Sequence, residues 1–234
     1  MAQEPPMPIP MSDSPYNAVV LDIEGTTTSI SFVYDALFPF ARRGLRAFLA
    51  THWEDPAVRQ DVATMSADLE GPDAAADHAL KLMDDDVKDT GLKGLQGRIW
   101  RAGYLSGELR GHVFPDVPPA LERWRGAQVP VYIYSSGSIA AQKLLFGHSL
   151  VGDLLGLLKG HFDTTTGPKK KAASYRAIAE AIAVTPSQTL FATDSLAEAE
   201  AAREAGFQVA VCVRPDNPAL AEHGFRTVSD FTSL

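Results

Sequence analysis

The sequence has only one cysteine, Cys212, among 234 residues. A single cysteine cannot form a disulfide within the chain, so we expect a protein of a reducing compartment, the cytoplasm. No apolar run approaches the roughly 20 residues that a membrane-spanning helix needs. The proline-rich residues 1–15 contain no Lys or Arg and no apolar leader segment. We therefore expect no membrane partner, and a disordered tail over residues 1–15.

Positive charge is also scarce, with 21 Lys and Arg against 29 Asp and Glu and a net charge of −8. This balance argues against nucleic acid as a partner, because binding a phosphate backbone requires a basic surface. A small phosphate substrate stays compatible, because a few local cations can hold one phosphate group. The G-x-x-x-x-G-K-[ST] loop of nucleotide hydrolases is absent. Nothing in the sequence demands an oligomer, and we expect a monomer.

Four short runs rich in β-branched and aromatic residues predict strands that are buried on both faces, because they lack a polar alternation. Helical patterns separate the later runs, and alternating strands and helices are typical of a doubly wound parallel α/β sheet. In such a sheet, ligands bind beyond the carboxyl ends of the strands. The four runs cover residues 18–26, 129–138, 189–195 and 207–214.

Residues 36–112 differ from the rest of the chain, because their patterns predict helices and no strand. A helical block placed after the first strand of a sheet predicts an inserted cap domain. The α/β core is then discontinuous, with residues 16–35 and 113–234. A cluster of prolines at positions 115, 118 and 119 marks the return to the core and the start of a new helix.

Two carboxylates follow the first predicted strand, in "VVLDIEGTTT". Asp22 stands where it can act as a nucleophile, a metal ligand or a helix cap. Glu24 faces the same side if the backbone stays extended, so it can handle a proton while Asp22 attacks a phosphoryl group. The alternative is a capping cluster, because Asp and Thr are ordinary N-caps.

Hydroxyl and amino groups occupy two further candidate positions, one after a predicted strand and one before a predicted helix. Ser135 and Ser136 follow the second strand, where hydroxyls and free backbone N–H groups can bind an anion. A run of three lysines, residues 169–171, precedes a helix and can neutralise a phosphate. The alternatives are a serine-rich helix cap and a solvated charge run, and the lysine run leaves open which of its members acts.

A third carboxylate, Asp194, follows the third predicted strand. Together with Asp22 it makes a candidate Mg²⁺ site, because this ion takes oxygen ligands and keeps several waters. Glu198 lies one helical turn further and can hold a metal-bound water. Capping is again the alternative for Asp194.

The order of these groups, a carboxylate pair, a hydroxyl, a lysine and a carboxylate, resembles the haloacid-dehalogenase-like phosphotransferase superfamily from about residue 16 to the C-terminus. The resemblance implies that Asp22 is the nucleophile and that Ser135 and a lysine of the 169–171 run hold the phosphate. It also implies that Asp194 binds the metal. Its fold, a Rossmann-like core with a cap, matches the architecture predicted above.

Longer segments sharpen the resemblance. Most superfamily members carry Asp where this chain has Glu24. The chain resembles the enolase-phosphatases (acireductone synthases) of methionine salvage in four segments, "LDIEGTTTSISFVYDALFPFA", "LQGRIWRAGY", "VYIYSSGSIAAQKLLFGHS" and "HFDTTTGPK". That family implies Lys169 as the lysine, with Ser135 and Ser136 on the phosphate. It also implies one Mg²⁺ per chain, held by Asp22, Glu24 and Asp194.

The resemblance further implies a two-step reaction. 2,3-Diketo-5-methylthiopentyl-1-phosphate enolises and then loses phosphate, which gives 1,2-dihydroxy-3-keto-5-methylthiopentene. Glu24 would act as general acid and base. The base for enolisation stays open between Glu24 and a cap residue in "LQGRIW", residues 95–100. The cap would cover the methylthioalkyl end, and we expect Phe48, Trp100 and Tyr104 mostly to pack in its core.

Three other functions remain open at this stage. The first is a Mg²⁺-dependent phosphatase of the same superfamily that acts on another small phosphate ester. The second is a haloacid dehalogenase, which uses the same aspartate on carbon and needs no Mg²⁺. The third is a binding module that keeps the fold without activity.

Overall fold

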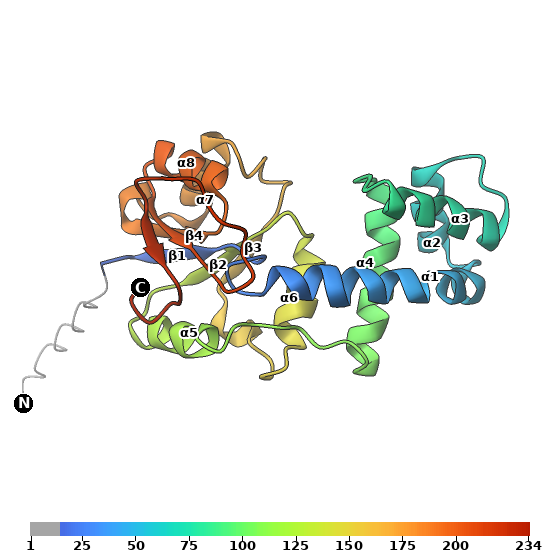
Figure 1. The fold of residues 1–234 in the computed structure, drawn as a ribbon, viewed down its shortest axis with the longest axis horizontal. Coiled ribbons are helices and arrows are strands. Elements are labelled where there is room, and N and C mark those ends of the chain that lie inside the picture. The colour runs from blue at the N-terminus through green and yellow to red at the C-terminus, as the bar shows by residue number, and fades with distance from the viewer. Residues whose placement is uncertain (1–14) are drawn as a thin grey trace, which may run out of the picture.

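The computed structural model describes residues 15–234, so the predicted disorder of residues 1–15 falls almost wholly outside the described part. Two lobes are evident in Figure 1, a sheet with helices packed on it and a smaller lobe made only of helices. Within residues 15–234, no helix has the length and apolar character to cross a membrane.

The sheet has six parallel strands in the order β3-β2-β1-β4-β5-β6, which confirms the parallel α/β class. The first strand lies in the middle, so its carboxyl end meets those of β2 and β4 at one edge. The prediction found four of the strands and missed the two short edge strands, β3 and β6. The strands are β1 (Ala18–Leu21), β2 (Val131–Tyr134), β3 (Gly160–Phe162), β4 (Thr189–Thr193), β5 (Gln208–Cys212) and β6 (Arg226–Val228).

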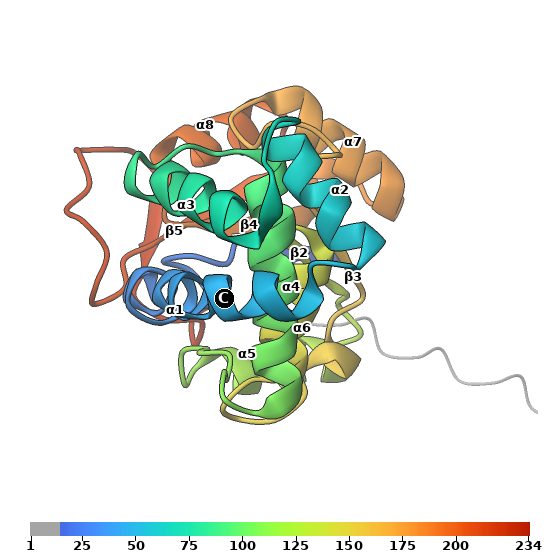
Figure 2. The same cartoon turned by 90° about the vertical axis from the view of Figure 1, so that its right-hand side faces the viewer.

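Helices cover both faces of this sheet (Figures 1 and 2). Val19 and Leu21 of β1 pack on the side of α5 (Val117–Gly126) and α6 (Ile139–Gly147). Val20 packs on the opposite side, against α7 (Ala172–Ile182) and α8 (Leu196–Glu204). Because both faces are buried, the strands carry apolar residues at successive positions.

The helical lobe, which corresponds to the proposed cap of residues 36–112, has its own apolar core. Asp55 and Asp89 start two of its helices by accepting hydrogen bonds from Ala57 N and Leu92 N, both at 2.8 Å. The core contains Leu45, Leu49, Val58, Val62, Leu92, Leu95 and Ile99, with Phe48 and Trp100 packed against it as expected. The lobe contains α1 (Phe38–His52), α2 (Pro56–Met65), α3 (Gly71–Asp84) and α4 (Thr90–Ser106).

Two adjacent linkers join the lobes. Phe114 N donates to Thr27 O at 3.0 Å, and Ser29 N donates to Nδ1 of His112 at 3.2 Å. The first linker then enters a π-helical turn, η1 (Phe32–Leu37), that continues into α1. Two short 3-10 turns complete the structure, η2 (Leu155–Leu157) and η3 (Pro186–Gln188).

Candidate active site

Asp22 stands directly after β1, at the carboxyl end of the sheet, and is 5% exposed. Its Oδ1 accepts hydrogen bonds from Ile23 N at 2.7 Å and from Nζ of Lys169 at 2.6 Å. Its Oδ2 accepts from Oγ1 of Thr193, at the end of β4, at 3.1 Å. The carboxylate is therefore held in one orientation by three donors. The prediction did not include Thr193.

A tight turn carries the chain away from Asp22. Gly25 has φ +63, a left-handed conformation that favours glycine. The N–H groups of Thr26, Thr27 and Thr28 all donate to Ile23 O, at 3.2, 2.9 and 2.9 Å. The three threonines are buried and build this turn.

Lys169 is buried between two carboxylates. Its Nζ lies 2.6 Å from Oδ1 of Asp22 and 2.7 Å from Oε2 of Glu198. Burial favours the neutral amine, but these two carboxylates outweigh it and raise the lysine pKa. Lys170 and Lys171 are exposed, so Lys169 is the member of the run that reaches the site.

The loop that presents Lys169 is fixed by three side-chain hydroxyls. Tyr175 donates to the carbonyl of Lys169 itself at 2.7 Å. Tyr134, at the end of β2, donates to Gly167 O at 2.8 Å, and Ser174 donates to Pro168 O at 2.8 Å. The backbone before α7 is thereby tied to the sheet edge.

The serine loop after β2 is tied down in a similar way. The side-chain amide of Gln142 donates to Gly137 O at 2.9 Å and to Phe162 O at 2.8 Å. Oγ of Ser135 accepts from Gly137 N at 3.2 Å, while Ser136 is exposed. Ser138 starts α6 by accepting from Ala141 N at 3.3 Å.

These groups converge on one cavity of about 200 Å³. It brings together seven of the candidates from the sequence, without Lys170, Lys171 or residues 95–100, and adds Ile30 and Tyr34 from the linker into the cap. The lining residues are Asp22, Glu24, Ile30, Tyr34, Ser135, Ser136, Lys169, Asp194 and Glu198. A larger hollow beside α8, of about 520 Å³, lies on the open surface and has no comparable set of groups.

Carboxylates outnumber cations in the cavity. Burial, with a contribution from Asp22, raises the pKa of Asp194 to about 7. Burial and Asp22 likewise raise the pKa of Glu198 to about 7, and the same two causes raise the pKa of Glu24. The side chain of Lys169 is the one cation among the cavity-lining residues. The site therefore has an excess of negative charge that a bound cation would neutralise.

The residues fit a Mg²⁺ ion with few protein ligands. Within residues 15–234, no three His, Cys, Asp or Glu side chains are grouped so that they alone would hold a metal. Mg²⁺ does not need such a group, because it commonly binds one or two carboxylates and keeps several waters. Gly25 lets the carboxylate of Asp194 approach the turn after Asp22 closely, because a Cβ there would stand 2.2 Å from Oδ2 of Asp194.

The segment 95–100 of α4 serves the cap itself. Nε of Arg98 donates to Oδ2 of Asp61 at 2.6 Å, and Nε1 of Trp100 donates to Leu37 O at 2.8 Å. Leu95 is part of the cap core. Of the described residues that line the cavity, none belongs to this segment. Tyr104 is buried in the apolar cluster between the lobes, as expected for a packing residue.

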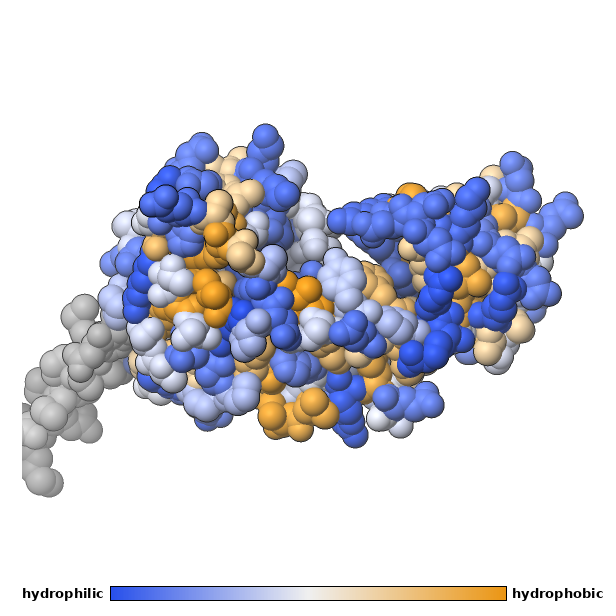
Figure 3. Space-filling model, viewed as in Figure 1, coloured by the Kyte–Doolittle hydropathy of each residue, from blue (hydrophilic) through white to orange (hydrophobic). Residues whose placement is uncertain are grey.

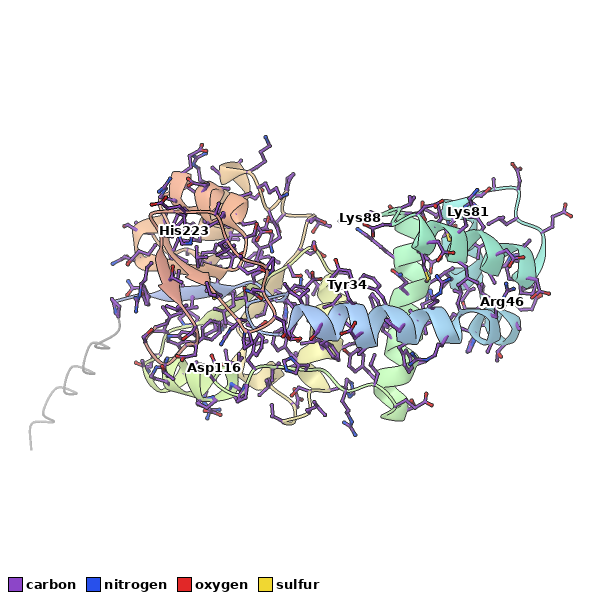
Figure 4. All side chains as sticks on the ribbon, viewed as in Figure 1. Tyr34, Arg46, Lys81, Lys88, Asp116 and His223 are labelled. Atoms are coloured by element: carbon purple, nitrogen blue, oxygen red, sulfur yellow. The ribbon has the colours of Figure 1, made fainter. Side chains whose placement is uncertain are left out.

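A hollow separates the two lobes on the face shown in Figure 3. Figure 4 shows Tyr34 between the lobes, at the start of the long helix that leads from the core into the cap. Tyr34 is 61% exposed although it is large and largely apolar. No motif in the sequence singled out Tyr34, and its exposure beside the cavity is what reveals it.

Comparisons with known proteins agree with this site. Residues 16–206 match the family model of the haloacid dehalogenase-like hydrolases. "Enolase-phosphatase E1" of Synechococcus elongatus is 46% identical over 241 aligned residues, which cover 97% of this chain and 100% of that protein. The protein of the same name from Drosophila melanogaster is 47% identical, over 92% and 91% of the two chains.

Solved structures of other proteins share the fold of this chain. The UTR4 protein of Saccharomyces cerevisiae superposes with a TM-score of 0.82 at 33% identity, covering 94% of this chain and 100% of that one. CbbY of Rhodobacter sphaeroides, at 17% identity and a TM-score of 0.58, shares the fold. The chain belongs to the haloacid dehalogenase-like hydrolases and, among them, to the enolase-phosphatases.

Proposed function

We propose that this enzyme enolises 2,3-diketo-5-methylthiopentyl-1-phosphate and then removes its phosphate, which yields 1,2-dihydroxy-3-keto-5-methylthiopentene in methionine salvage. The observation that carries the proposal is the cavity in which Asp22, Glu24, Lys169 and Asp194 meet. The full-length similarity to enolase-phosphatases supports the choice of substrate.

Asp22 is the proposed nucleophile. Its carboxylate attacks phosphorus in line with the bond to the leaving oxygen, so an aspartyl phosphate forms as the bond between phosphorus and that oxygen breaks. The three donors that orient Asp22 support this role, because they fix the attacking group before the substrate arrives. Lys169, Ser135 and Ser136 hold the phosphoryl oxygens.

Glu24 is the proposed acid and base. In the phosphatase step it donates a proton to the leaving oxygen on C1, and then takes one from the water that hydrolyses the aspartyl phosphate. Burial and the neighbouring Asp22 raise the pKa of Glu24, which favours its protonated form and so supports the role of proton donor. Lys169 already pairs with both Asp22 and Glu198, so we assign it to neutralising negative charge rather than to transferring a proton.

Enolisation requires loss of a proton from C1 and protonation of the oxygen on C2. Of the two candidates for the base, Glu24 lines the cavity, whereas residues 95–100 are used in the cap. We therefore assign the proton abstraction to Glu24. The C1=C2 double bond forms as the proton leaves, and the negative charge moves to the oxygen on C2, which solvent water protonates. Glu24 keeps the C1 proton and can pass it to the leaving oxygen in the phosphatase step.

Asp22, Asp194 and the backbone or side chain of Glu24 are the proposed holders of one Mg²⁺. When bound, the ion neutralises charge on the phosphoryl oxygens and polarises carbonyl oxygens as a Lewis acid. Residues 36–112 form the proposed cap over a core of residues 16–35 and 113–234. A monomeric state and a cytoplasmic location complete the proposal.

The deciding experiment supplies purified protein with the diketo phosphate, with Mg²⁺ or with a chelator, and follows the ultraviolet band of the enol together with free phosphate. The proposal predicts both signals with Mg²⁺ and little phosphate in chelator. Phosphate release from simple esters without any enol would instead indicate a phosphatase for another small ester. Turnover that persists in chelator would favour a dehalogenase-like reaction.

A further inference from the structure

Lys88 belongs to the turn between α3 and α4, at the tip of the cap. Figure 4 shows it on the side of the cap that faces the core, above Tyr34. Figure 3 shows hydrophilic surface of the cap reaching toward the core across the hollow at this level. Lys88 and Glu24 are close enough for their charges to interact across the hollow.

The backbone on both sides of Lys88 is held in place. Before it, Asp86 takes a left-handed conformation, φ 49, and Val87 N donates to Leu82 O at 2.9 Å, which closes the end of α3. After it, Asp89 accepts from Leu92 N at 2.8 Å and starts α4. Two helix ends that meet in so short a turn fix the direction in which the lysine leaves the cap.

The ammonium group of Lys88 makes no hydrogen bond or ion pair with any residue of the described range, 15–234. Lys88 is exposed, and among the residues that the structure describes no carboxylate lies within 4.0 Å of it. By contrast, the charge of Lys169 is shared by two carboxylates at 2.6 and 2.7 Å. Lys88 therefore presents an uncommitted positive charge on the side of the cap that faces the core (Figure 4).

Enolisation creates negative charge on the substrate, and the one cation among the described residues that line the cavity, Lys169, is already shared by two carboxylates. The phosphate end of the substrate lies with Lys169, Ser135 and Ser136, whereas the negative charge that develops on the C2 oxygen lies further along the carbon chain. A preorganised cation beside a developing oxyanion lowers the barrier to its formation. A lysine that faces Glu24 from the opposite lobe is suitably placed for this task.

We propose that Lys88 is a catalytic residue of the enolisation step, which contacts the diketone oxygens from the cap and stabilises the enolate that forms when Glu24 removes the C1 proton. This inference rests on the proposed function. It assigns to the cap a chemical role in the first reaction, in addition to its role in covering the substrate.

The test compares Lys88→Met with Lys88→Arg and with Lys81→Met. Lys81 is an exposed lysine of α3 that lies away from the hollow in Figure 4, so its loss removes the same charge from the same lobe. Each variant is assayed for enol formation from the diketo phosphate and for phosphate release from p-nitrophenyl phosphate, which has no enolisable carbonyl.

Lys88→Met is expected to slow enol formation by about 10- to 100-fold and to affect hydrolysis of the simple ester at least ten times less. Lys88→Arg should recover part of the enolisation rate, and Lys81→Met should match wild type in both assays. Equal losses in the two assays, or an unchanged enolisation rate, would overturn the inference. If wild type itself forms no enol, the proposed function fails instead, so the two failures are distinguishable.

Discussion

The two ends of the cavity are built differently. At the core end, Asp22, Lys169 and Glu198 are buried and each has at least one partner at a fixed distance. At the cap end, Tyr34 lines the cavity and is exposed, Lys88 lies beyond the lining on the cap, and no salt bridge within residues 15–234 holds the lysine. We infer from the difference a division of work, in which the core end carries out phosphoryl transfer and the cap end presents exposed side chains to the rest of the substrate.

The largest expected effect comes from removing the cation of the core end. Lys169→Met leaves Asp22 and Glu198 facing each other without compensation, so phosphate release should fall by about 10³-fold. The same change should lower the free energy of unfolding by about 3 kcal/mol, because it breaks a buried ion pair. Steady-state phosphate assays and denaturant titration measure the two effects. Lys170→Met, at an exposed position, is the matched control and should change neither by much.

Gly25→Ala tests how closely the core end is packed. A Cβ there would lie 2.2 Å from Oδ2 of Asp194 and 2.9 Å from Oδ1 of Asn217, and φ +63 adds strain of about 1 kcal/mol. We expect roughly a 10²-fold loss of activity and weaker Mg²⁺ binding, measured by Mg²⁺ titration of the rate. Gly97→Ala is the control, because a Cβ at Gly97 meets nothing within 4 Å. A variant at Gly25 with wild-type Mg²⁺ dependence would show that Asp194 can move freely.

Asp194→Asn separates activity from stability. Burial and Asp22 raise the pKa of Asp194 to about 7, so the folded state holds a proton that the unfolded state has lost. Stability is therefore lost as pH rises from the unfolded value near 4 towards 7. In chelator at pH 8, the free energy of unfolding of Asp194→Asn should exceed that of wild type by on the order of 1 kcal/mol, after allowance for solvent screening. The variant should nevertheless be inactive.

Denaturant unfolding at pH 5 and pH 8 checks the predicted direction of this pH dependence of stability. The advantage of Asp194→Asn should shrink as pH falls, and added Mg²⁺ should stabilise wild type more than the variant at pH 8. A wild type that is the more stable of the two in chelator at pH 8 would mean that the carboxylates of the core end are already neutralised without a metal.

The smallest effect is expected at the cap end. Tyr34→Ala removes an apolar surface at the mouth of the cavity, which should raise KM for the diketo phosphate about tenfold, as expected from the loss of roughly 1.4 kcal/mol of apolar contact. The KM for ethyl phosphate, which has no methylthioalkyl end, should stay near its wild-type value. Tyr34→Phe keeps the ring and serves as the control. An equal change for both esters would place Tyr34 on the phosphate instead.

The core end was largely predictable from the sequence, because its groups follow strand ends that must meet at one edge of a parallel sheet. Asp22, Ser135 and Asp194 were found in this way, and the choice of Lys169 followed from the resemblance to a family. Thr193 was missed because a threonine inside a strand pattern is an ordinary β-forming residue. Strand β3, with three residues at the sheet edge, was missed because so short a run carries no periodicity.

The cap end was not predictable in the same way. Its helices follow from the apolar period of 3.6 residues, but that period does not tell which exposed residues turn towards the core. The positions of Tyr34 and Lys88 relative to the cavity depend on how the linkers and the turn between α3 and α4 place the cap over the sheet. This placement is a property of the tertiary structure. For "LQGRIW", an alternative source of the enolisation base, the structure shows Arg98 and Trp100 in hydrogen bonds within the cap, and the choice of base stays a prediction.

The most direct test of the division between the two ends is Asp22→Asn, assayed with the diketo phosphate and Mg²⁺ while the enol band and free phosphate are followed together. The account predicts that the folded variant still forms the enol phosphate but releases phosphate at least about 10³-fold more slowly than wild type. Phosphate release at the wild-type rate would contradict the role of Asp22 as nucleophile. Loss of the enol along with the phosphate, in a variant that still folds and binds Mg²⁺, would contradict the separation of the two steps.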